Sequence, residues 1–389
     1  MLQTSISFRG LSQQCQIENK YYQDFDKTPS HTTLENWVCK VGYYELTRPK
    51  EKASDWIIIL DHSIQIGSSK ILVIYGIRSS QIDFSRALTY TDLTILRIKI
   101  RDQWTGANVK EELSNLQQEL GSILYAVADH GSNLKKGLSL AGITHIHDIS
   151  HRVAILMEKR YLKDPVYMSF NQHLSGMRSK LLQANLAHLI PAGARKKSVF
   201  QNIGKDAQWA DGFLYALKNK TLEPAEHDVI SWLLEYESFI QEISSLDRII
   251  GNIEKILKNN GLSQQTLQEC NALINTQEHL LSEQGKKIVN QIREYAKECL
   301  IVLPQVPILL CTSDIIESTF GKYKNFSSEN KMACITKMVL TLAAITVDIS
   351  PEKVMHIMEK VKLRDVDKWD KENIGVTTLK KRINLLSDN

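Results

Sequence analysis

The chain has 389 residues, with 48 Lys and Arg against 44 Asp and Glu, and 43% of its residues are hydrophobic. With only 8 Pro and 18 Gly, this composition excludes a disordered, collagen-like or coiled-coil protein and predicts about two or three folded domains. No apolar run approaches the roughly 20 residues that cross a bilayer, so we expect no membrane partner and a cytoplasmic location.

The first 50 residues contain two short helix-like stretches, 7–19 and 30–41, joined by a polar link with a proline. A Ser/Thr cap followed by Glu35 opens the second stretch, which favours a helix-turn-helix. Its link is longer than usual and a third supporting helix is missing, so a shortened motif and a plain helical hairpin are both open. We expect Ser30, His31, Thr32, Thr33 and Asn36 to face DNA, and Leu34, Trp37 and Val38 to pack inward.

In the next part of the chain the sequence pattern becomes strand-like, and after three strands it alternates between helices and strands. Residues 56–67, 70–78 and 93–102 are rich in β-branched residues and predict three consecutive strands. Two further strands, 123–129 and 143–149, alternate with helices that are predicted at 105–121, 132–142 and 151–162. This order predicts a mixed α/β sheet of the ribonuclease H-like type.

From about residue 165 to 300 every convincing segment is helical, including 228–259 and 266–300. Two more helices are predicted at 313–326 and 331–348. We therefore expect four parts: a helix-turn-helix-like region over 1–50, a catalytic domain over 51–165 and 305–350, an all-helical insertion over 166–304, and a helical tail over 351–389.

Three acidic residues occupy positions that suit a shared site. Asp61 interrupts an apolar strand, Asp129 ends the fourth strand, and Glu317 lies one turn into a late helix. Strands one and four are neighbours in the predicted sheet, so the two aspartates would stand side by side. Three carboxylates form an all-oxygen site suited to two Mg²⁺ or Mn²⁺ ions, which support phosphodiester displacement. The competing interpretation is that these residues are caps and turn residues.

Four sequence blocks carry a resemblance to a known family. They are WIIILDHSIQIGSSKILVIYGI, LYAVADHGSNLKKGL, THIHDISHRVA and SDIIESTFGKYK. They resemble bacterial insertion-sequence transposases of the DDE type, over roughly 5–160 and 305–350. The resemblance implies that Asp61, Asp129 and Glu317 are the metal-binding catalytic triad, with Asp314 as the alternative third ligand. It also implies double-stranded DNA partners, namely transposon ends and target, and a homodimer.

The segment HDISH allows two interpretations. The resemblance implies a supporting role for Asp148 and His151 near the site, whereas the plain alternative is an N-cap aspartate beside a surface histidine. A zinc site formed by His145, His147 and His151 is a further, weaker hypothesis.

A basic block over 151–205 holds ten Lys and Arg against two acidic residues. Such residues bind phosphate without reading sequence. Within it, we expect Arg195, Lys196 and Lys197 to contact DNA, and outside it Lys322 and Lys324, which follow Glu317.

The predicted function is metal-dependent cleavage at transposon ends followed by strand transfer into target DNA. Two alternatives remain open on the sequence: a catalytically inactive, transposase-derived DNA-binding protein, and another ribonuclease H-like nuclease.

Overall fold

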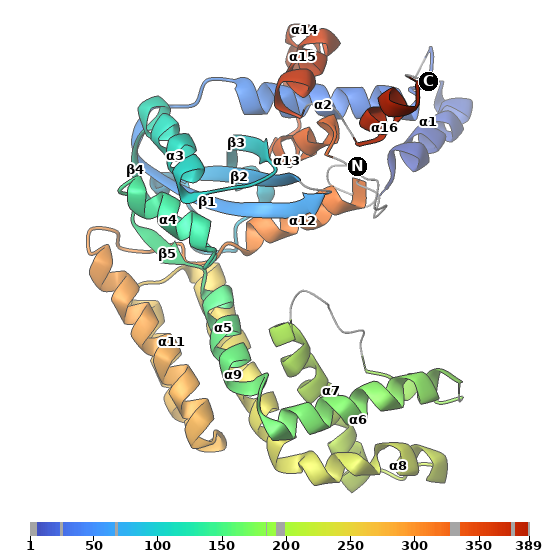
Figure 1. The fold of residues 1–389 in the computed structure, drawn as a ribbon, viewed down its shortest axis with the longest axis vertical. Coiled ribbons are helices and arrows are strands. Elements are labelled where there is room, and N and C mark those ends of the chain that lie inside the picture. Colours follow the sequence, from blue (N-terminus) through green and yellow to red (C-terminus); the bar gives the residue numbers. More distant parts are fainter. Residues whose placement is uncertain are drawn as a thin grey trace. The chain divides into compact units, whose positions relative to one another are not determined.

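The computed structural model describes residues 6–23, 26–66, 69–183, 185–191, 199–326, 335–374 and 378–387. The chain divides into two compact units (Figure 1). The sheet unit comprises residues 1–83, 87–147 and 312–389, and the helical unit comprises 84–86 and 148–311. Within the described residues, no helix is long and apolar enough to cross a membrane.

The sheet unit contains a five-stranded mixed sheet. Its strands are β1 (Ala53–Ile66), β2 (Ser69–Arg78), β3 (Thr94–Arg101), β4 (Gly121–Ala128) and β5 (His145–His147). The order is β3-β2-β1-β4-β5, with β1–β2 and β2–β3 antiparallel, and β1–β4 and β4–β5 parallel. This confirms the predicted ribonuclease H-like topology, in which an antiparallel meander is extended by parallel strands.

One face of the sheet is covered by α3 (Gly106–Leu120) and α4 (Ser132–Leu140) (Figure 1). Local signals fix the bounds of α3. Thr105 and Asn108 form a capping box at its start, and Gly121, with φ of +94°, ends it. The core on this face contains Trp56, Ile58 and Leu60 from β1 packed against leucines of both helices.

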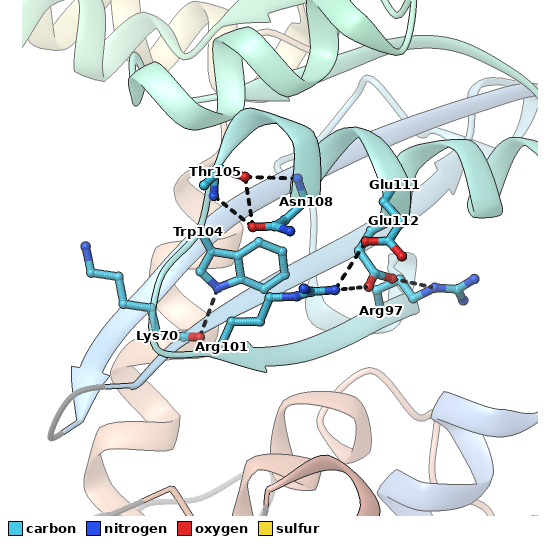
Figure 2. Close-up of polar contacts among 8 residues, drawn as sticks. All are labelled: Lys70, Arg97, Arg101, Trp104, Thr105, Asn108, Glu111 and Glu112. Carbon is cyan, nitrogen blue, oxygen red and sulfur yellow. Dashed lines mark hydrogen bonds and ion pairs between the residues drawn. The ribbon is translucent and has the colours of Figure 1, made fainter.

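Charged residues fasten α3 to the edge strand β3 (Figure 2). The Glu112 carboxylate is only 5% exposed and lies 3.8 Å from Arg97 Nε and 3.7 Å from Arg101 Nη2. Arg101 also pairs with Glu111 at 3.4 Å and covers the Trp104 ring. Trp104 in turn donates a hydrogen bond to the Lys70 carbonyl at 3.1 Å. One buried carboxylate thus connects two cations of the strand to the helix.

The opposite face is covered by helices from both ends of the chain. The helices α2 (His31–Thr47), α12 (Asp314–Phe326) and α13 (Thr341–Ala344) contact its strands, whereas α1 (Phe8–Tyr22), α14 (Pro351–Lys360) and α15 (Leu363–Asn373) pack on α2; α16 (Thr378–Ser387) follows. A core of α2, α13, α14 and α15 includes Cys39, Ala344, Ile357 and Val366. The approach is so close that a Cβ on Gly42 would lie 2.0 Å from the Leu340 carbonyl oxygen.

The helical unit has its own apolar core. Its helices are α5 (Ile149–Tyr161), α6 (Pro165–Gln183), α7 (Val199–Asn219), α8 (Pro224–Ile230), α9 (Glu237–Asn260), α10 (Gln264–Gln277) and α11 (Glu283–Val302). Phe170, Leu233 and Ile240 are buried at the centre of one cluster, with Trp209 and Trp232 packed against it. The two tryptophans are therefore part of this apolar core.

Several expectations differ from the structure. Residues 151–162 form α5 as predicted, but α5 packs with the helical unit, which begins at Asp148 rather than at 166. The predicted helix 228–259 is divided by a 3₁₀ turn at Ser231–Tyr236. Where 331–348 is described, it forms a 3₁₀ turn, Lys337–Leu340, and the four-residue α13, because a Thr336 side-chain cap starts a new turn there. The residues after 350 belong partly to the core rather than to a separate tail.

Candidate functional site

Asp61 and Asp129 lie at the same end of the sheet on neighbouring strands. The last paired position of β1 and β4 is Leu60 with Ala128, and each aspartate directly follows it. Neighbouring strands are separated by about 4.8 Å, so the two residues are adjacent across the sheet. Both side chains are half-buried. The geometry therefore brings together the two aspartates that the sequence singled out.

The alternation of side chains decides which face the aspartates occupy. Leu60 packs into the core beneath α3 and α4, so Asp61, one residue on, belongs to the opposite face. On that face Tyr75, which pairs with Ile59 on β1, donates a hydrogen bond to the Leu342 carbonyl at 2.8 Å. The Tyr75 hydroxyl also interacts with Thr319 of α12. Asp61 and α12 therefore share one face of the sheet.

Glu317 lies in the first turn of α12. The helix buries Ile316, Thr319 and Phe320, whereas Glu317 is exposed beside them. Two contacts of Tyr90 add to the anchoring of α12. The Tyr90 hydroxyl lies 2.6 Å from the Ser318 hydroxyl, and Lys322 Nζ lies 4.1 Å from the centre of the Tyr90 ring. Glu317 therefore lies on an anchored helix that packs on the same face of the sheet as Asp61.

Asp314, the alternative third acid, is the first residue of α12. Its backbone N–H donates to the Thr312 hydroxyl at 3.3 Å. It lies one turn before Glu317, on the same side of the helix.

The Asp129 carboxylate has a defined local environment. Its Oδ1 accepts a hydrogen bond from the Gly131 backbone N–H at 2.8 Å. Two histidines lie within its electrostatic reach: burial lowers the pKa of His62 to about 4 and also lowers the pKa of His145, while the Asp129 charge acts in the opposite direction on both. Burial thus favours the neutral form of both imidazoles, and His62 lies beside Trp104 with ring centres 5.3 Å apart.

The donor set suits a hard divalent cation by type, because carboxylate oxygens are the ligands that Mg²⁺ and Mn²⁺ prefer. Asp61 and Asp129 fit that role by placement, and Glu317 lies on the same face. Across the described part of the chain, however, no group of three His, Cys, Asp or Glu side chains is gathered tightly enough to hold a metal ion. The same finding covers the hypothetical zinc site, since His145 and His147 are described and in ring contact at 4.0 Å.

Asp148 is the N-cap of α5, and it is fully buried. Its Oδ1 accepts the His151 backbone N–H at 2.8 Å and lies 3.1 Å from His151 Nδ1. This is the capping arrangement that the plain interpretation of HDISH predicts. Both residues belong to the helical unit.

The predicted DNA-contacting residues at the N-terminus have mixed environments. Ser30 caps α2 by accepting the Thr33 N–H, and Ser30 and Thr32 are exposed, while His31 and Thr33 are half-buried. Asn36 instead accepts a hydrogen bond from Lys337 at 3.2 Å. The inward packing expected of Trp37 is wrong, since its side chain is 43% exposed.

Trp37 is exposed because α2 buries a different face, which carries Leu34, Val41 and Glu45, whereas Val38 is half-buried.

Among the predicted basic contacts, Lys324 is exposed and Lys322 lies over Tyr90. Arg195, Lys196 and Lys197 fall outside the described residues.

Sequence reasoning missed two contributors to this region. Tyr90, which holds α12, lies in a connecting segment without a motif. His130 stacks on His147, with ring centres 3.9 Å apart and an angle of 7° between the rings. The signal for this stack was present as a histidine directly after Asp129, but the partner could be found only from the pairing of β4 with β5.

No protein-family model matches the chain, and no curated protein matches it. Among solved structures, the chain is similar to the Drosophila P element transposase strand transfer complex, with 12% sequence identity and a TM-score of 0.43, over 90% of this chain and 94% of that chain. A likeness this distant carries no inference about activity, which therefore depends on the topology and the side chains at the end of the sheet.

Proposed function

We propose that the chain is a metal-dependent DNA transposase of the DDE type, of the kind carried by insertion sequences. It would cleave DNA at transposon ends and join the freed 3′-hydroxyl to target DNA. One observation carries the proposal: two aspartates directly follow the last paired residues of adjacent parallel strands in a ribonuclease H-like sheet.

In this proposal, Asp61 and Asp129 hold Mg²⁺ or Mn²⁺, and Glu317 completes the site from α12. Bound there, a pair of ions supplies activation of the attacking hydroxyl and stabilisation of the leaving oxygen. The chain's own residues bind and orient the DNA: Lys324 is exposed near the end of α12, and Ser30 and Thr32 are exposed at the start of α2. A homodimer acting on two ends, double-stranded DNA as partner and a cytoplasmic location are parts of the same proposal.

The test is a strand-transfer assay with Mn²⁺ and DNA that carries the sequences flanking the gene. We expect activity from the wild type and at least 1,000-fold less from Asp61→Asn, Asp129→Asn and Glu317→Gln, since each removes a metal-binding charge. Asp314→Asn is the matched control one turn away on α12 and keeps activity. Loss with Asp314→Asn and retention with Glu317→Gln would reverse the assignment of the third acid.

A DNA-binding protein without catalysis is the second candidate. It is favoured by the finding that, among the residues the structure describes, three potential ligands are not gathered at one point. It predicts that the wild type binds the flanking DNA in a gel-shift assay but never cuts it, with or without Mn²⁺. Equal cleavage of RNA–DNA hybrids or of DNA without those flanking sequences would instead indicate a general nuclease.

A further inference from the structure

Three imidazoles surround the main chain next to Asp129. His130 directly follows Asp129, and its ring stacks face to face on His147 of β5, with centres 3.9 Å apart. The His145 ring also contacts His147, with its centre 4.0 Å from that of the His147 ring. Rings at this separation are in van der Waals contact, so the three side chains restrict one another.

The register of the sheet produces this cluster. Ala126 pairs with His145 and Ala128 pairs with His147, so both imidazoles project on the face of those alanines. His145 Nε2 lies 3.3 Å from the Ala128 carbonyl, which belongs to the residue before Asp129. The histidines thus contact the chain on both sides of Asp129, through Ala128 and through His130.

The turn from Asp129 to Gly131 determines how the carboxylate points. Asp129 Oδ1 accepts the Gly131 N–H at 2.8 Å, which leaves Oδ2 as the oxygen not used in that bond. A Cβ on Gly131 would lie only 2.9 Å from Oδ1, so the turn is tight. His130 is the middle residue of the turn, and a displacement of its ring changes the backbone that orients the carboxylate.

We propose that His147 is a positioning residue: through its stack on His130, it holds the Asp129 carboxylate in the orientation that binds the divalent cation. This rests on the proposed function, because it assumes that Asp129 is a metal ligand. His147 acts through the face of its ring and not through a nitrogen lone pair. Residues that contact a metal ligand without binding the ion themselves commonly change the metal affinity by about tenfold or more when they are mutated.

A role of His147 as a direct metal ligand is a different prediction, because a ligand binds the ion through a ring nitrogen. The two roles differ in what a substitution must retain. Positioning requires a flat ring at residue 147, whereas ligation requires a nitrogen or oxygen donor.

The experiment measures Mn²⁺ binding to the full-length protein without DNA, by calorimetry and by the electron paramagnetic resonance signal of free Mn²⁺. His147→Phe keeps a flat ring and removes the donor, whereas His147→Asn keeps a donor and removes the ring. We expect His147→Asn and His147→Ala to weaken Mn²⁺ binding by tenfold or more, and His147→Phe to stay within about twofold of the wild type.

The matched control is His173→Ala, which removes a histidine stacked on Trp232 in the helical unit and leaves Mn²⁺ binding unchanged. If His147→Phe binds as weakly as His147→Ala, or if neither weakens binding, positioning by the stack is overturned. If His147→Ala fails to fold, Mn²⁺ binding by His147→Phe and by His147→Asn still tests the positioning role.

The failures of the two proposals are distinguishable. If wild type binds Mn²⁺, Asp129→Asn loses that binding and every His147 variant binds normally, only the positioning role falls. If wild type binds no Mn²⁺, the metal-dependent function and the positioning role fall together.

Discussion

Lys50, which follows α2, is an amine in an unfavourable environment. Its Nζ donates a hydrogen bond to the Glu45 carbonyl, and burial, followed by repulsion from Arg48, lowers its pKa from 10.5 to about 7. Between pH 7 and pH 10.5 the unfolded chain therefore binds more protons than the folded one at this residue. By linkage, this group makes stability rise with pH across that window.

We predict that Lys50→Met increases the free energy of unfolding at pH 7 by on the order of 1–3 kcal/mol, because no buried charge remains. The gain over wild type should shrink at pH 9. Urea unfolding at both pH values measures it, with the exposed Lys52→Met as control. An equal gain at pH 7 and pH 9 would show that burial of charge is not the cause.

At the scale of residues, the sequence allowed predictions where a residue differs in chemical character from its neighbours. Asp61 was identifiable because a carboxylate interrupts an apolar strand, and Asp129 because it ends one. Trp37 was placed wrongly, since an aromatic residue on a helix can face either side and only the packing partners of α2 decide. The stack of His130 on His147 was beyond local reasoning because it depends on the register between two strands.

The contact between α3 and β3 depends on Glu112, which is buried between two arginines (Figure 2). We predict that Glu112→Ala lowers the free energy of unfolding by about 2–3 kcal/mol, because Arg97 and Arg101 lose a shared counter-charge in a partly desolvated site. Glu111 pairs with the same Arg101 but is 59% exposed, so Glu111→Ala should cost less than about 1 kcal/mol. Thermal and urea unfolding compare the two variants, and equal losses would refute the role of burial.

Elements with strong local signals were predicted closely. The five strands appear in the expected order, and α3, capped by Thr105 and Gly121, coincides with the helix predicted at 105–121. Residues 337–344 were expected within one long helix but form two short turns. Their buried residues pack against α2, which is about 300 positions earlier in the chain, and the sequence shows no sign of that partner.

The two ends of the chain meet where α2 crosses the segment around Leu340. Gly42 permits this approach, since a Cβ there would lie 2.0 Å from the Leu340 carbonyl oxygen. We predict that Gly42→Ala destabilises the protein by about 3 kcal/mol or more, because backbone must move. Gly212→Ala is the control: that helical glycine has nothing within 4 Å, and alanine should stabilise α7 by up to about 1 kcal/mol. Calorimetry should therefore show a lower melting temperature for Gly42→Ala and a higher one for Gly212→Ala.

The helical unit should be separable from the sheet unit. Residues 148–311 hold an apolar core of their own, whereas the sheet unit needs residues after 311 to cover one face. We predict that a fragment of residues 148–311 is helical and melts cooperatively by circular dichroism. A chain ending at Cys311 should lack a folded sheet, detected as rapid proteolysis between residues 53 and 147. Protection of that region in the shortened chain would contradict the prediction.

At the scale of the whole molecule, the helical interruption was predictable because its residues have helical periodicity from end to end. Its beginning was misplaced by about 18 residues, since nothing in the sequence of α5 tells which core it joins. The contribution of α14 and α15 to the core of the sheet unit was also missed, for the same reason.

The interrupted order of the sheet unit has a consequence during synthesis on the ribosome. All five strands are complete by His147, yet α12 and α13, which cover one of their faces, begin only at Asp314. At roughly 5–20 residues per second, a translating ribosome takes on the order of 10–30 s to make the intervening segment. During that time the helical unit can fold, while the nascent sheet exposes an apolar face. The order of the elements along the chain therefore leaves that face accessible to chaperones until α12, which carries Glu317, has been synthesised.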